Sequence, residues 1–285
     1  MQKIILIIII FFHIIIHKVV LSQPIDTNYY LFVGHLYRSP DKVDIRIENL
    51  DLTKYKGVWL GGDVCGELVN KISTLHYIDS LFNLSNPLTF WALGNHDARN
   101  ANWEWIKQFT KRETFFNQTF DNTVSIVLNP NILPDNCFML DKQFEMIKNV
   151  CDTIKNSTNL IIISHHCLWE GVPGVPSPIY YAHRFIPYWN SNCNDVNSTF
   201  VNSIYPILVS VKNRDINVIN VFGDMGLWYP KKIEYVSDDG IYFLGCGLSN
   251  NAHPQTDYVL IFKTVPFEKK LFWEFKLLNS LKSKK

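Results

Sequence analysis

The chain has 285 residues, of which 47% are hydrophobic and 19% are charged, and its formal net charge at pH 7 is +1. This length and composition are typical of a globular α/β domain with a sizeable core. The near-neutral charge gives no electrostatic reason to expect nucleic acid as a partner.

The first 22 residues differ in composition from the rest of the chain. A mostly apolar run over residues 4–16 is too short for a comfortable membrane span, and small residues precede Gln23. Both features are typical of a signal peptide, so the sequence predicts cleavage before Gln23 and one domain over residues 23–285. We expect no stable membrane insertion after cleavage. A retained signal anchor is the alternative interpretation.

Two further features favour secretion. Asn-x-Ser/Thr sequons can accept N-linked glycans, and an even number of cysteines allows disulfides in an oxidising compartment. No two cysteines are spaced Cys-x-x-Cys, which argues against a zinc knuckle. We therefore expect a secreted or lumenal glycoprotein with disulfides, although Cys65 and Cys167 adjoin candidate site residues and fit buried thiols as well. The sequons begin at Asn83, Asn117, Asn156 and Asn197, and the cysteines are Cys65, Cys137, Cys151, Cys167, Cys193 and Cys246.

Apolar runs and helically spaced apolar residues alternate along most of the chain, and a run of strands follows. This order predicts a layered α/β sandwich, with antiparallel strands at the end. The strands are predicted at 28–34, 58–61, 88–93, 124–128, 137–140, 160–164, 216–222, 232–236, 241–245, 257–263 and 270–277. The helices are predicted at 67–84, 102–111, 141–154 and 195–212.

Four of the predicted strands end in Asp, Asn or His. The carboxyl ends of strands in an open α/β sheet border the crevice in which ligands bind. Carboxylate, amide and imidazole groups are common metal ligands, so the sequence predicts a metal site at this edge. The four segments are Gly62-Asp63, Gly94-Asn95-His96-Asp97, His165-His166 and Gly223-Asp224.

Over roughly residues 28–265, the order of these motifs resembles the calcineurin-like metallophosphoesterases. The resemblance implies an α/β/β/α sandwich of two packed mixed sheets flanked by helices. It also implies two metal ions about 3.5–4 Å apart that clamp a phosphate and activate water. The first and last motifs depart from the family pattern. Val33 stands where the family has an aspartate two residues before His35, and Gly223-Asp224-Met225-Gly226 replaces Gly-His-x-His.

The resemblance assigns the metal ligands residue by residue. Asp63 corresponds to the carboxylate that bridges both metals, and Asn95, His165 and Asp224 complete the second-metal set. His35 is the remaining ligand that belongs to the first metal alone. An aspartate in place of a histidine at position 224 favours harder ions such as Mn²⁺, Mg²⁺ or Ca²⁺ over Zn²⁺. We expect one or two divalent ions, of Mn, Mg, Fe, Zn or Ca.

The resemblance also implies catalytic and substrate-binding residues. His96 corresponds to a proton donor, with Asp97 as the group that orients its imidazole. His166 is a candidate for contact with the substrate. A proline-rich stretch over 170–194 follows it, and there His183 and Arg184 are further candidates for contact with the substrate.

Each of these residues also has a purely structural interpretation. His35 can be a core histidine with satisfied hydrogen bonds, and Asp63 and Asp224 can be turn or cap residues. His165 and His166 can simply pack against the sheet. Glu67 is a possible substitute ligand for the first metal, or else the exposed start of a helix.

The leading hypothesis is a secreted metal-dependent phosphoesterase whose substrate is a small phosphate mono- or diester. The alternative is a catalytically impaired protein of the same fold that binds a phosphorylated or glycan ligand. The incomplete first-metal set favours the alternative, whereas the intact His96-Asp97 pair favours the enzyme. The sequence indicates neither the oligomeric state nor the identity of the substrate.

Overall fold

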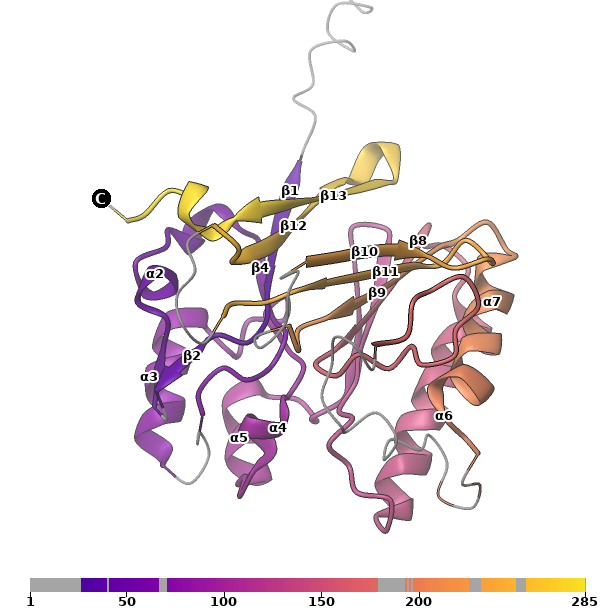
Figure 1. Cartoon of the computed structure of the whole chain (residues 1–285), viewed down its shortest axis with the longest axis horizontal. Coiled ribbons are helices and arrows are strands. Elements are labelled where there is room, and N and C mark those ends of the chain that lie inside the picture. The colour runs from indigo at the N-terminus through magenta and orange to yellow at the C-terminus, as the bar shows by residue number, and fades with distance from the viewer. Residues whose placement is uncertain are drawn as a thin grey trace, which may run out of the picture.

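The computed structural model describes residues 27–39, 41–66, 71–178, 193, 195, 197–225, 232–249 and 255–284. The strands form two large sheets packed face to face, with helices on both outer faces (Figure 1). The predicted signal peptide and the candidate residues Glu67, His183, Arg184 and Gly226 lie outside the described residues. Among the described residues, no helix is long and apolar enough to cross a membrane.

The first sheet has the strand order β13-β12-β1-β4-β5. β1, β4 and β5 are parallel, and β12 runs antiparallel to both of its neighbours, β1 and β13. Helices α2, α3 and α5 pack on its outer face. The strands are β1 (Asn28–Val33), β4 (Gly57–Leu60), β5 (Phe90–Trp91), β12 (Tyr258–Val265) and β13 (Lys270–Leu277). The helices are α2 (Ile45–Glu48), α3 (Ile72–Phe82) and α5 (Trp103–Thr110).

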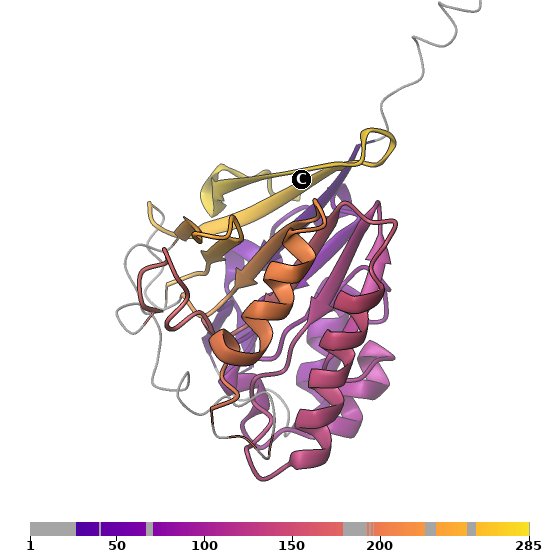
Figure 2. The same ribbon diagram turned by 90° about the vertical axis from the view of Figure 1, so that its right-hand side faces the viewer.

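The second sheet has the order β10-β11-β9-β8-β7-β6. Its four central strands are parallel, and the two edge strands pair antiparallel. Helices α6 and α7 lie along its outer face (Figure 2). The strands are β6 (Phe116–Phe120), β7 (Thr123–Val127), β8 (Asn159–Ser164), β9 (Asn217–Phe222), β10 (Lys232–Val236) and β11 (Tyr242–Cys246). The helices are α6 (Cys137–Thr153) and α7 (Tyr205–Lys212).

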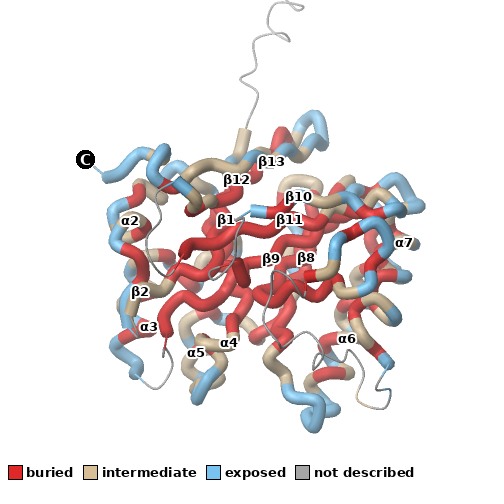
Figure 3. The backbone as a smooth tube through the Cα atoms, viewed as in Figure 1, coloured by how far each residue is buried: buried red, intermediate tan, exposed pale blue. Residues whose placement is uncertain are grey.

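The core has three layers, and Figure 3 shows that the buried residues concentrate in the sheets. Between the two sheets lies a cluster rich in aromatic side chains, in which Trp59 stacks on Tyr30 and Phe90 with ring centroids 5.2 and 5.4 Å apart. The other two clusters lie between each sheet and its helices. This layering confirms the predicted α/β/β/α sandwich of two mixed sheets.

Several local predictions were wrong. Residues 137–140 form the first turn of α6 instead of a strand, because the Asn136 side chain accepts a hydrogen bond from the Met139 amide and caps the helix there. The helix expected from position 195 begins with a π-helical turn at Phe200–Ile204. β6 was not predicted, and β5 spans two residues only. β11 pairs parallel to β9 instead of antiparallel.

One disulfide joins Cys137, at the start of α6, to Cys193. The other four cysteines are buried free thiols. Burial raises the pKa of Cys65 and that of Cys167, so both remain protonated and inert at neutral pH. The two cysteines that adjoin the candidate site therefore fit the buried-thiol interpretation.

The two sheets meet backbone to backbone at their carboxyl ends. Gly34 follows β1, Gly61 follows β4 and Gly223 follows β9. A Cβ atom on Gly223 would lie 1.9 Å from the Gly61 carbonyl oxygen, and one on Gly34 would lie 2.3 Å from the Gly223 carbonyl oxygen. Only glycine permits this close approach, which draws the loops after the three strands together.

We predict that Gly223→Ala destabilises the fold by about 3 kcal/mol, because the added methyl group must push the backbone at Gly223 away from the backbone at Gly61. Urea unfolding measures the change. Gly245→Ala is the matched control, since the nearest neighbours of its Cβ would be side-chain atoms, of Ile233 at 2.8 Å and of Met225 at 3.4 Å, which can move aside. Equal stability of the two variants would contradict the proposed constraint.

Candidate metal centre

The predicted ligands gather where the carboxyl ends of the two sheets meet. Asp63 follows β4 and is held in a left-handed conformation, with φ at 51°. His165 follows β8 and Asp224 follows β9, and because these strands are parallel neighbours, their ends lie side by side. All three side chains are buried. The structure thus brings together Asp63, His165 and Asp224 from two different sheets.

His165 is at the centre of this group. Its Nδ1 lies 2.7 Å from the Gly61 carbonyl oxygen, which fixes the ring. Its Nε2 lies 3.5 Å from Asp63 Oδ2 and 3.8 Å from Asp224 Oδ1. This nitrogen is buried and makes no hydrogen bond within the described part of the chain.

The electrostatics of the group favour a positive charge between the two carboxylates. Burial alone would keep the His165 ring neutral, but the carboxylates of Asp63 and Asp224 raise its pKa to about 10. Burial opposes ionisation of Asp63 and Asp224, yet interaction with His165 holds the pKa of both carboxyl groups below the ordinary value. Two buried carboxylates around an unpartnered imidazole nitrogen fit a divalent cation, which would supply the same compensation.

His166 belongs to the same cluster. Its Nδ1 lies 3.7 Å from Asp224 Oδ2, and ligand atoms of His165, His166 and Asp224 fall within 4.8 Å of one another. The other ring nitrogen lies 3.3 Å from Asn131 Oδ1. Burial lowers the pKa of His166 and keeps the ring neutral, which is the form that ligates metals. The expected substrate contact therefore has a second possible role as a metal ligand.

His35 lies near the carboxylate of Asp63, which also faces His165. Its Nε2 lies 3.9 Å from Asp63 Oδ2, and its Nδ1 lies 3.0 Å from the Leu248 carbonyl oxygen. Burial lowers the pKa of His35, although nearby carboxylates act in the opposite direction. Asp63 Oδ2 thus faces both His165 and His35, which is the geometry expected of a bridging carboxylate. Val33, two residues before His35, is fully buried in the apolar cluster between the first sheet and its helices.

Asn95 and His96 open α4 (Asn95–Ala98), a single helical turn after β5. The amide of His96 donates a 3.0 Å hydrogen bond to Asp63 Oδ1, which fixes both segments. The His96 ring is half-buried, with its centroid 4.9 Å from that of Tyr37 and its Nδ1 3.2 Å from the Gly66 carbonyl oxygen. The Tyr37 ring also contacts the His35 ring at 4.7 Å. Tyr37 therefore holds two candidate site residues at once.

Asp97 does not orient the His96 ring as expected. Its carboxylate accepts 2.9 Å hydrogen bonds from the amides of Val64 and Gly94 and a 3.1 Å bond from Trp91 Nε1. Complete burial and the charge of Asp63 raise its pKa to about 7. Asp97 thus ties the loop after β4 to the loop after β5, and its role is to position backbone.

A cavity of about 720 Å³ opens beside the candidate metal centre, and Asn95 and His166 form part of its wall. Trp103 and Leu133 provide apolar surface, and Lys107 adds a positive charge. This size and mixed lining are typical of a small-molecule site.

Two residues at the site were not predicted. Asn131 bonds to His166 and donates a 2.7 Å hydrogen bond to the Leu93 carbonyl oxygen. It follows the predicted strand 124–128, so the rule that polar residues at strand ends form the site would have found it. Tyr37 lies in a short hairpin after His35, and no sequence pattern distinguishes it from a surface tyrosine.

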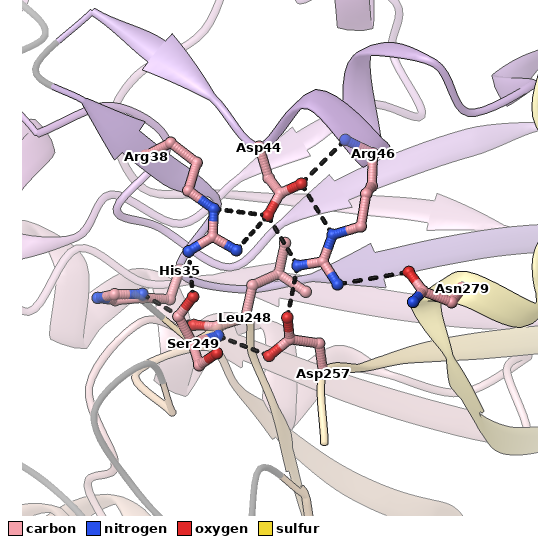
Figure 4. A network of polar contacts seen from close by, with 8 residues as sticks. All are labelled: His35, Arg38, Asp44, Arg46, Leu248, Ser249, Asp257 and Asn279. Atoms are coloured by element: carbon pink, nitrogen blue, oxygen red, sulfur yellow. Dashed lines mark hydrogen bonds and ion pairs between the residues drawn. The ribbon is translucent and has the colours of Figure 1, made fainter. Parts of the chain in front are cut away.

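A buried ionic network holds the His35 side of the site (Figure 4). Asp44 accepts hydrogen bonds from the guanidinium groups of Arg38 and Arg46, with N–O distances of 2.7 Å for Arg38 Nε and 3.0 Å for Arg46 Nε. Arg38 also donates to the Ser249 carbonyl oxygen, and the Ser249 amide donates to Asp257 at 2.8 Å. The network therefore locks the 247–249 segment, whose Leu248 carbonyl holds His35.

Comparison with known proteins supports the fold. No family model and no curated protein matches the sequence. A dimetal phosphatase from Danio rerio is 9% identical with a TM-score of 0.56, covering 90% of this chain and 97% of that chain. A metallophosphoesterase from Sphaerobacter thermophilus is 8% identical with a TM-score of 0.32, covering 87% and 88%. The first similarity shows that this chain has the fold predicted from its motifs.

We predict that Asp44→Ala lowers the free energy of unfolding by about 3 kcal/mol at neutral pH, since two guanidinium groups lose their buried partner. Burial alone would raise the pKa of Asp44, but hydrogen bonds and charge from Arg46 and the charge of Arg38 hold it below the ordinary value. The contribution is thus present above about pH 4 and is lost as pH falls through the lowered pKa. Urea unfolding from pH 7 to pH 3 measures the difference between wild type and variant. A difference that stays constant over this range would contradict the ionic interpretation.

Proposed function

We propose that this chain, which has the calcineurin-like metallophosphoesterase fold, hydrolyses a phosphate mono- or diester with the help of divalent metal ions. The observation that carries the proposal is the buried Nε2 of His165, which faces Asp63 and Asp224 and has no hydrogen-bond partner among the described residues. Metal ions at this site would supply Lewis-acid activation of the phosphate and of the attacking water. Asp63, Asn95, His165 and Asp224 are the proposed ligands of one ion.

A second, weaker ion is proposed beside His35. The Nε2 of His35 and Oδ2 of Asp63 offer two ligand atoms there, and the valine at position 33 offers none. The site beside His35 has fewer protein ligands than the site formed by Asp63, Asn95, His165 and Asp224. We therefore infer that the four-ligand site binds its ion tightly, whereas the ion beside His35 needs water or the substrate phosphate as additional ligands. The carboxylate-rich tight site favours Mn²⁺ or Mg²⁺ over Zn²⁺.

The chain's own residues have distinct proposed roles in the reaction. His96 donates a proton to the leaving oxygen, and its ring is held for this task by Tyr37 and the Gly66 carbonyl. Asn95 and His166 line the cavity, and His166 also lies 3.7 Å from Asp224 Oδ2, so the cavity adjoins the proposed metal site. The organic group of the phosphoester lies in that cavity, against Trp103 and Leu133.

The compartment is also a proposal. We infer that the protein is secreted, with residues 1–22 removed. The disulfide between Cys137 and Cys193 is consistent with an oxidising compartment. The sequons at Asn83, Asn117, Asn156 and Asn197 are the proposed glycosylation sites.

A second candidate function is a binding protein of the same fold that has lost catalysis. The observation that favours it is Val33, which is buried in the core and leaves the first-metal set incomplete. Such a protein would hold a phosphorylated or glycan ligand without turnover. Mn²⁺-dependent hydrolysis of aryl phosphate mono- or diesters by the purified protein distinguishes the enzyme from this alternative.

We predict that Asp224→Ala abolishes tight binding of Mn²⁺, because it removes one of four proposed ligands. His35→Ala should leave tight binding nearly intact, since the tight site does not include it. Isothermal titration calorimetry measures both, and Asp152→Ala, an exposed change on α6, is the matched control. Equal losses in the Asp224 and His35 variants would contradict the division into a tight and a weak site.

We predict that His96→Ala slows turnover of the best aryl phosphate substrate by ~10²–10⁴-fold, the usual contribution of a general acid. Its affinity for Mn²⁺ should remain close to that of the wild type, because only the backbone amide of His96 touches Asp63. His76→Ala removes an exposed histidine on α3 and is the control. Turnover that survives the loss of His96 would mean that another group protonates the leaving oxygen.

A further inference from the structure

The end of the molecule opposite the candidate metal centre carries exposed aromatic and basic side chains. β12 runs antiparallel to β1, with Asn28 paired to Thr264, so the β12–β13 turn lies beside the start of β1 (Figure 1). The metal centre lies beyond the other end of β1, past Val33. We call this exposed group the hairpin patch, which consists of Tyr29, Lys263, Phe267, Lys269, Lys270 and Phe272.

The aromatic residues of the hairpin patch face solvent. Phe267 is 95% exposed, and Phe272 and Tyr29 are 49% and 41% exposed. Figure 3 shows the β12–β13 turn as an exposed projection above the buried strands. Phe267 is almost fully exposed on a projecting turn, and the half-exposed Phe272 and Tyr29 lie on the adjoining strands, so this end of the sheet offers apolar surface to another phase or partner.

The register of the sheet explains why these side chains are uncovered. Tyr29, Lys263 and Phe272 are laterally paired across β1, β12 and β13, so they form one row on one face of the sheet. Further along the same face, Leu31 and Ile261 are buried under the helices. This row of the hairpin patch therefore continues a covered apolar face beyond the end of its helices.

The turn that presents Phe267 is held by polar contacts. Asn122 Nδ2 donates a 2.8 Å hydrogen bond to the Pro266 carbonyl oxygen. Thr158 Oγ1 donates a 2.9 Å bond to the Lys269 carbonyl oxygen. These bonds anchor both sides of the turn to the second sheet, so Phe267 is held away from the core instead of collapsing onto it.

The charge around these aromatic residues is positive. The segment from Lys263 to Phe272 holds three lysines and one glutamate, Glu268, whose carboxylate pairs with Lys270 at 2.6 Å. The Lys263 ammonium lies 6.0 Å from the Phe272 ring centroid. Exposed aromatic rings interleaved with lysines suit the headgroup region of a bilayer, where rings enter the acyl boundary and ammonium groups meet phosphates.

We propose that the hairpin patch docks on the surface of an anionic lipid bilayer. Phe267 and Phe272 enter the headgroup boundary, and Lys263, Lys269 and Lys270 bind lipid phosphates and carboxylates. This contact is peripheral and does not span the membrane. Because the metal centre lies at the opposite end of β1, docking leaves it open to solution.

A local fluorescence probe tests the proposal in the chain that begins at Gln23, the mature form inferred above, so that the apolar segment before it does not contribute to vesicle binding. Phe267→Trp places a reporter in the hairpin patch. Phe138→Trp places one at a 74% exposed position at the start of α6, near the opposite end. With vesicles of phosphatidylcholine and phosphatidylserine, we expect a blue shift and quenching by brominated lipid for Phe267→Trp only. An unchanged spectrum for Phe267→Trp, or equal quenching of both reporters, would overturn the proposal.

Vesicle sedimentation measures the contributions of the lysines and of the phenylalanines separately. Because each lysine near an anionic surface contributes roughly fivefold in affinity, the double variant Lys269→Glu, Lys270→Glu should bind phosphatidylserine vesicles at least ~20-fold more weakly. Phe267→Ser combined with Phe272→Ser should weaken binding by about tenfold or more. Binding that is unchanged in both double variants would show attachment through another part of the chain and would overturn the proposal.

Discussion

The close approach of backbone at Gly34, Gly61 and Gly223 is the constraint on which the rest of the structure depends. Each sheet alone places polar residues at its own carboxyl edge, which is a common property of parallel strands. A two-sheet site forms only if those edges touch, and side chains at these positions would hold them apart. The bridging position of Asp63 between His165 and His35 therefore follows from the absence of three Cβ atoms.

Bringing the ends of the two sheets together buries the carboxylates of Asp63 and Asp97, which is unfavourable unless polar or charged groups compensate them. The two carboxylates are compensated differently. Backbone amides and an indole satisfy the carboxylate of Asp97, so that group can be buried without a cation. Asp63 receives an amide on one oxygen only, and its other oxygen faces imidazoles. The hydrogen bonds of these two neighbouring carboxylates distinguish a structural role for Asp97 from the proposed ligand role of Asp63 more clearly than their places in the motif do.

The sequence predicted the layered fold and the strands that end at the site, because buried parallel strands are long apolar runs with a polar residue at the end. Prediction from the sequence failed mainly for residues whose role depends on a contact with a residue distant in the chain. The packing of Tyr37 between two histidines depends on three-dimensional neighbours. The role of Asp97 was misread for the same reason, since its partner Val64 lies on a different loop. The helix cap at Asn136 is instead a local signal, three residues before Met139, which the apolar run 137–140 obscured.

The arrangement of the strands also divides the molecule into two ends with different chemistry. Parallel strands bring their carboxyl ends, and thus the polar loops after them, to the metal centre. In the first sheet, β12 runs antiparallel to β1, so the turn between β12 and β13 lies beside the amino end of β1. That turn carries no proposed ligand, so its residues are free of the constraints that the metal centre imposes. An exposed phenylalanine among lysines can remain there without disturbing the site, and a contact made at this end leaves the cavity beside His166 open to solution.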